Sequence, residues 1–65
     1  MINKFPNIIS NPEILGGKPC IKGTRISVEL IIEWLATGGN IQTIVAKHPL
    51  LTEEAVKEAI FYANN

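Results

Sequence analysis

The residues whose chemistry could support catalysis or metal binding are few and far apart in the sequence. The chain has one histidine, His48, and one cysteine, Cys20, whereas a structural zinc site takes four such ligands. Glu53 and Glu54 are adjacent, so on a helix their side chains diverge instead of flanking a substrate. Nothing in the sequence places Ser27 or Cys20 beside His48, the base that would activate a nucleophile. We therefore expect a protein that is not an enzyme and that uses no cofactor and no metal.

The length of the chain limits it to one small domain over residues 1–65. A chain of this size buries only about 60% of its unfolded surface, so a partner or a second copy would help to stabilise it. The single cysteine excludes an internal disulfide framework and suits a reducing compartment. The chain shows neither the apolar core of a signal peptide nor a run of about 18 apolar residues. We expect a cytoplasmic protein with no membrane contact.

Residues 27–65 carry three stretches with the apolar spacing of amphipathic helices. Ser27, Asn40 and Thr52 stand where each helix would begin, and their side chains can accept a backbone N–H bond there. Gly38-Gly39 is typical of a helix end, and Pro49 stops the second helix. The apolar positions are Val28, Ile31, Ile32 and Leu35; then Ile41, Ile44 and Val45; then Val56, Ala59, Ile60 and Ala63. The sequence predicts a three-helix bundle over residues 27–65.

Residues 1–26 favour extended structure instead. They hold three of the four prolines and three of the five glycines, and they show no helical apolar stripe. Gly23 and Thr24 are typical of a turn rather than of a binding site. The stretches compatible with β-structure are residues 5–10, 18–22 and 24–26. We expect an extended arm over residues 1–26 that forms a small N-terminal β-hairpin and leans on the helices.

The succession of the last two helices has the spacing of a helix-turn-helix, whose final helix normally lies in the major groove of DNA. The charges argue against that simple version. Residues 1–27 hold four basic residues and one acidic residue, whereas residues 28–65 hold two basic and five acidic. DNA phosphates would repel Glu53 and Glu54 at the start of the last helix. The candidates for DNA contact are therefore mostly basic residues outside that helix, namely Lys18, Lys22, Arg25, Lys47 and Thr52.

Two alternatives accompany this interpretation. Arg25 could pair with Glu29 or another acidic residue of the helices and hold the arm to them, because a guanidinium fork can tie a turn to a carboxylate. The acidic helical half could face a basic protein partner instead of DNA.

Three apolar residues are candidates for an interface with a partner. Phe61 and Tyr62 are consecutive on the last predicted helix, so they diverge by about 100° and cannot both face the core. Leu50 lies in the predicted turn between the last two helices. Trp34 is flanked by residues of the first apolar stripe, so we expect it in the core. The predicted partner interface consists of Leu50, Phe61 and Tyr62.

The stretch from Asn11 to Ile26, with its strings Gly16-Gly17-Lys18-Pro19 and Gly23-Thr24-Arg25-Ile26, resembles the opening signature of a bacterial and archaeal family called domain of unknown function 433. The similarity continues through Gly38-Gly39 and residues 48–52 and 59–63, so it covers residues 5–63. The resemblance implies a helix-turn-helix domain of the winged-helix or homeodomain-like type. It also implies the antitoxin of a toxin–antitoxin pair, whose usual partner is a PIN-like ribonuclease toxin.

The favoured function is therefore that of an antitoxin that binds and silences a ribonuclease toxin, with binding to operator DNA as a further role. Two other functions stay open. One is a protein-interaction module with the shape of a helix-turn-helix and no DNA role, and the other is a stand-alone transcription regulator. A homodimer formed through the β segment would supply the two-fold symmetry of an operator. Because the chain stops two residues after Ala63, we expect the toxin contact to come from the domain itself or from its arm.

Overall fold

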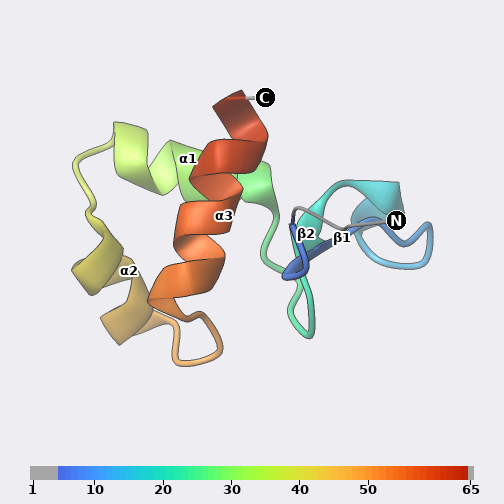
Figure 1. The fold of residues 1–65 in the computed structure, drawn as a ribbon, viewed down its shortest axis with the longest axis horizontal. Coiled ribbons are helices and arrows are strands. Elements are labelled where there is room, and N and C mark those ends of the chain that lie inside the picture. The colour runs from blue at the N-terminus through green and yellow to red at the C-terminus, as the bar shows by residue number, and fades with distance from the viewer. Residues whose placement is uncertain (1–4, 65) are drawn as a thin grey trace.

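The computed structural model describes residues 5–64, which form three helices and a two-stranded antiparallel sheet (Figure 1). In chain order the elements are strand β1 (Ile8–Ile9), a 3-10 turn η1 (Leu15–Gly17), strand β2 (Cys20–Ile21), and helices α1 (Val28–Ala36), α2 (Ile41–Lys47) and α3 (Glu53–Asn64). Residues 1–4, including Lys4 of the basic half, and residue 65 lie outside the described residues. The predicted class, a mainly helical three-helix domain with an N-terminal β element, is confirmed.

The sheet is shorter than the sequence predicts. Ile8 lies opposite Ile21, and Ile9 lies opposite Cys20. Only two residues of the stretch 5–10 are in a strand, because the chain turns at residues 5–8, where the Ile8 N–H donates to the Phe5 carbonyl at 3.0 Å. The stretch 24–26 is not a strand either, and the chain meets β2 there through a single bridge between Cys20 and Ser27. The strand partner of β2 is therefore β1, and the segment after the turn adds this bridge, in which the Ile21 N–H donates to the Ile26 carbonyl at 2.9 Å and the Val28 N–H to the Pro19 carbonyl at 3.0 Å.

The turn after β2 is held by Thr24. The Thr24 N–H donates to the Ile21 carbonyl at 3.0 Å, and Gly23 takes a φ of 81°, as the third position of a type II turn requires. The Thr24 hydroxyl donates to the same carbonyl at 2.8 Å and accepts the Ile26 N–H at 3.0 Å. Thr24 is buried, so the structure confirms that Gly23 and Thr24 are turn residues.

All three predicted helix caps are present. The Ser27 hydroxyl accepts the Leu30 N–H at 3.0 Å, the Asn40 side chain accepts the Thr43 N–H at 2.9 Å, and the Thr52 hydroxyl accepts the Ala55 N–H at 3.1 Å. Each bond satisfies a backbone donor that has no partner within its own helix. At α2 the Thr43 hydroxyl also accepts the Asn40 N–H at 3.0 Å, which completes a reciprocal capping box. After α1 the chain turns through Gly38, whose φ is 103°.

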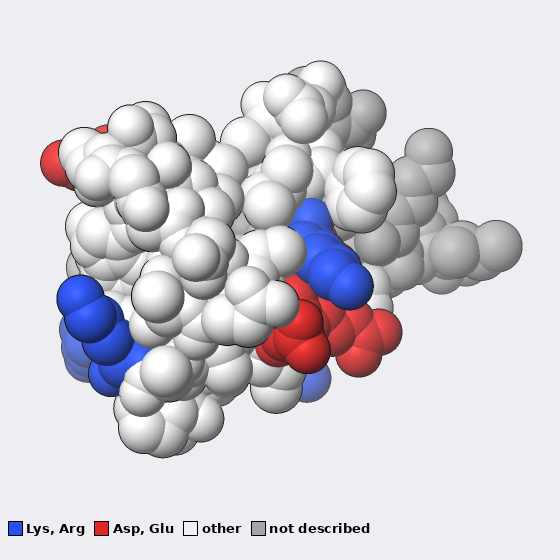
Figure 2. Space-filling view, turned by 90° about the vertical axis from the view of Figure 1, so that its left-hand side faces the viewer, with Lys and Arg blue, Asp and Glu red and all other residues white. Residues whose placement is uncertain are grey.

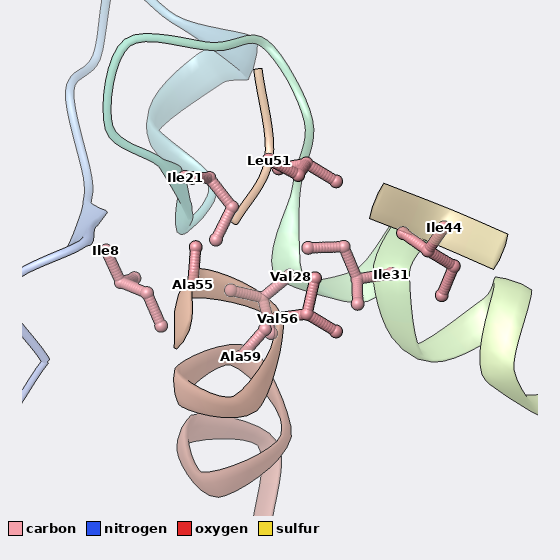
Figure 3. Packing of buried hydrophobic residues seen from close by; sticks show 9 residues of the cluster. All are labelled: Ile8, Ile21, Val28, Ile31, Ile44, Leu51, Ala55, Val56 and Ala59. Carbon is pink, nitrogen blue, oxygen red and sulfur yellow. The ribbon is translucent and has the colours of Figure 1, made fainter. Parts of the chain in front are cut away.

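The core lies where α1, α2 and the strands meet α3 (Figure 3). Its nine buried hydrophobic residues come from every element except η1 and also from the α2–α3 linker. They are Ile8, Ile21, Val28, Ile31, Ile44, Leu51, Ala55, Val56 and Ala59. Trp34 packs against this cluster but is only partly buried, and its ring stacks on His48 with 4.3 Å between centroids. None of the helices between residues 5 and 64 has the length and hydrophobicity needed to cross a bilayer.

The adjacent leucines of the α2–α3 linker provide a test of this packing. Leu51 is 2% exposed and Leu50 is 72% exposed. We expect Leu51→Ala to lower the free energy of unfolding by about 2–5 kcal/mol, because it leaves a cavity in the core. Leu50→Ala removes the same atoms from an exposed position and should change the free energy of unfolding by less than about 0.5 kcal/mol. Urea unfolding followed by circular dichroism measures both, and equal losses would contradict the packing described here.

Candidate functional site

The exposed side of α3 is the surface that a helix-turn-helix would present to DNA. Helices α1 and α2 and strand β1 all pack against the opposite side of α3, which carries its buried residues. The exposed residues Glu54, Lys57, Phe61 and Asn64 recur every three or four positions, so they share one side of the helix. We call these four residues the outward face of α3. Phe61 is 67% exposed on it, a large apolar side chain with little cover.

The charge at the start of α3 does not suit contact with DNA. Glu53 and Glu54 are both exposed in the first turn, where they favour the positive end of the helix dipole. The same carboxylates would repel phosphate groups at the end of the helix that normally reaches the bases. Thr52, a predicted DNA-binding residue, uses its hydroxyl oxygen to cap the helix.

The predicted basic residues are exposed but are distributed over the surface. Lys18, Lys22, Arg25 and Lys47 all face solvent. Lys18 lines a groove together with Glu29. Arg25 lines a second hollow together with Leu50. Lys47 lines a third hollow together with His48. On the side of the molecule shown in Figure 2, basic side chains lie at the lower left and again directly beside a group of acidic side chains nearer the centre, with uncharged surface between the two basic groups. The structure therefore provides local basic contacts, and the face in Figure 2 has no continuous basic strip.

Arg25 lies beside Leu50, one of the predicted interface residues. Both line a hollow with Ile14, Gly23 and Thr24. Among residues 5–64 Arg25 forms no ion pair, so the alternative in which it is tied to Glu29 is wrong. The Gly23-Thr24 turn thus places Arg25 at the same hollow as an exposed leucine.

Tyr62 differs from its neighbour Phe61. Its ring meets Phe5 edge-on, with 5.3 Å between the centroids and 80° between the planes, and Tyr62 is partly buried. Phe61 is thus the more exposed residue of the pair, and Tyr62 holds the arm against α3. A contact between Tyr62 and a partner stays a prediction.

A second attachment of the arm was not found by sequence reasoning. The Asn7 backbone N–H donates to Glu58 Oε1 at 3.0 Å, and the Asn7 side-chain amide donates to Glu58 Oε2. The Asn7 carbonyl in turn accepts the Lys22 N–H at 2.8 Å. One carboxylate on α3 therefore fixes the residue that precedes β1 and, through it, the residue that follows β2. No periodicity or motif links Asn7 to Glu58, so no local signal could have revealed the contact.

The residues with metal-binding or nucleophilic chemistry stay apart. Cys20 is buried at β2, whereas the His48 ring stacks on Trp34 at the end of α2. Within the described part of the chain, no three His, Cys, Asp or Glu side chains come together in a group that could hold a metal ion.

The fold and its surfaces define a small three-helix domain with a β arm clamped to its last helix. Residues 8–63 match the family described as "Protein of unknown function (DUF433)", and the chain belongs to this family. The chain is 34% identical over 56 residues to the uncharacterized protein y4eO of Sinorhizobium fredii. That match covers 86% of this chain and 25% of the relative, so the chain spans about a quarter of the relative's length. No solved structure matches the chain.

The clamp between Asn7 and Glu58 is tested by hydrogen exchange. In Glu58→Ala both Asn7 donors lose their acceptor, which costs about 1–3 kcal/mol for a group that stays partly buried. We expect the Lys22 amide, which bonds to the Asn7 carbonyl, to exchange at least tenfold faster as the arm opens. Glu54→Ala removes an exposed carboxylate from the same helix and should leave this rate close to that of the wild type. Unchanged protection in Glu58→Ala would show that the clamp does not hold the arm.

Proposed function

We propose that this protein is a cytoplasmic, non-enzymatic antitoxin that binds and neutralises a PIN-like ribonuclease toxin. The observation that carries the proposal is the outward face of α3, where exposed Phe61 stands on the same side as Glu54. A ribonuclease holds RNA phosphates with basic residues, so the exposed carboxylates of Glu53 and Glu54 in the first turn of α3 are complementary to it and speed the encounter. An exposed aromatic side chain is the kind of anchor that dominates binding energy at protein interfaces.

The second contact that supports this proposal is Leu50. It is exposed in the linker directly before α3, and it lines the same hollow as Arg25. An apolar side chain next to a cation suits a partner surface that presents a carboxylate beside an apolar residue. Leu50 and Phe61 would thus anchor the toxin near the two ends of α3.

The proposal is tested by the affinity for a catalytically inactive PIN-like ribonuclease toxin. Calorimetry should show a saturable complex with the wild type, and Phe61→Ala should weaken it at least tenfold because it removes the aromatic anchor. Gln42→Ala, an exposed polar change on α2, is the matched control and should bind like the wild type. Absence of a complex with the wild-type chain would overturn the proposal. Equal affinities of Phe61→Ala and Gln42→Ala would exclude the outward face of α3 as the contact.

Binding to operator DNA is the second candidate function, and the observation that favours it is the exposed pair Lys22 and Arg25 in one turn. Fluorescence anisotropy with the protein's own upstream duplex and a scrambled duplex, over a salt series, measures it. We expect preference for the upstream duplex, and the double variant Lys22→Ala/Arg25→Ala should reduce the salt dependence by about two phosphate contacts. Lys57→Ala on the outward face of α3 is the control and should have little effect. No binding at low salt would exclude a stand-alone transcription regulator and leave a module that contacts only protein.

A further inference from the structure

A groove lies between the first turn of α1 and the last turn of α3, away from the outward face. It has a volume of about 440 Å³. Its floor is apolar, and its rim carries one cation and one anion. The floor includes Val28, Ile32, Tyr62 and Ala63, and the rim includes Lys18 and Glu29.

The two rim charges have no partner within the described part of the chain. Lys18 and Glu29 are exposed, and neither forms an ion pair with the other or with another residue of 5–64. A charge of each sign beside one apolar floor restricts the kind of molecule that fits. Nucleic acid would bring phosphates against Glu29, and a uniformly basic protein surface would bring cations against Lys18. Each of these partners leaves one rim charge facing its own sign, which costs free energy at an interface.

We propose that this groove is a two-fold interface between two copies of the chain. Around a two-fold axis the same patch meets itself, so each residue of one copy contacts the corresponding partner residue of the other. The two apolar floors cover each other, and Lys18 of each copy faces Glu29 of the other. The interface uses the ends of α1 and α3 and not the β segment to which the sequence alone assigned a dimer. The interface does not include Phe61 or Leu50, so this proposal does not depend on the proposed toxin contact.

The small size of the domain makes this association favourable. The core holds nine buried hydrophobic residues, and a domain this small gains little from its own core. Partly buried Ile32 and Tyr62 would lose their remaining contact with water in the dimer, which adds apolar burial that the single chain cannot reach.

Charge reversal tests the pairing directly. Sedimentation equilibrium from micromolar to millimolar protein should show a reversible dimer for the wild type. Lys18→Glu and Glu29→Lys each place like charges across the axis and should raise the dimer Kd at least tenfold. The double variant Lys18→Glu/Glu29→Lys restores opposite charges and should return the Kd to within about threefold of the wild type. Lys22→Glu and Glu33→Lys reverse exposed charges outside the groove and should leave the Kd unchanged.

A steric variant separates loss of the dimer from loss of the fold. Ala63→Arg fills the groove at the exposed end of α3, where a cation favours the helix dipole. It should be monomeric with an unchanged far-ultraviolet circular dichroism spectrum. A wild type that stays monomeric at millimolar concentration would overturn the proposal. A dimer that none of the groove variants weakens, or a double reversal that is no tighter than the single ones, would also overturn it.

Discussion

The domain is organised around one side of α3. Helices α1 and α2 and strand β1 all pack against it, and the residues it presents there, Ala55, Val56 and Ala59, are small and buried. Small side chains let three elements approach one helix closely, and Figure 1 shows α3 standing between α2 and the strands. On α3 itself, the described residues therefore leave only the outward face and the two ends open to another molecule.

The arm is part of the same arrangement. Glu58 and Tyr62 stand four residues apart on α3, and they hold Asn7 and Phe5 of the arm, respectively. The position of β1 is thereby fixed, and through the sheet so is that of the Gly23-Thr24 turn, which presents Arg25 beside Leu50. The partly buried bond between Asn7 and Glu58 thus helps to place the groups that the domain offers to a partner. The outward face of α3 and the Arg25–Leu50 hollow are separate surfaces of one domain.

Sequence reasoning predicted the features that depend on neighbours within a few residues. Ser27, Asn40 and Thr52 cap the helices because a cap bond reaches only three residues ahead, and apolar periodicity located the buried sides. It missed the Asn7–Glu58 bond and the stacking of Trp34 on His48, because both form only after the chain has folded back. The left-handed backbone of Leu15, whose φ is 52°, was not predicted either, because this conformation is usually taken by glycine. Sequence reasoning thus named the residues of the candidate surfaces, but it did not predict that the fold would distribute them over separate parts of the domain.

The central claim is that the open surface around α3 contacts a protein, with Phe61 and Leu50 as anchors. Nuclear magnetic resonance of the isotopically labelled chain, titrated with the inactive ribonuclease, tests it most directly. The account predicts saturable shifts that centre on Phe61, Glu54 and Leu50, while the amides of the buried side of α3 change little. Shifts confined to Lys18, Lys22 and the strands, or no saturable shifts at all, would contradict it.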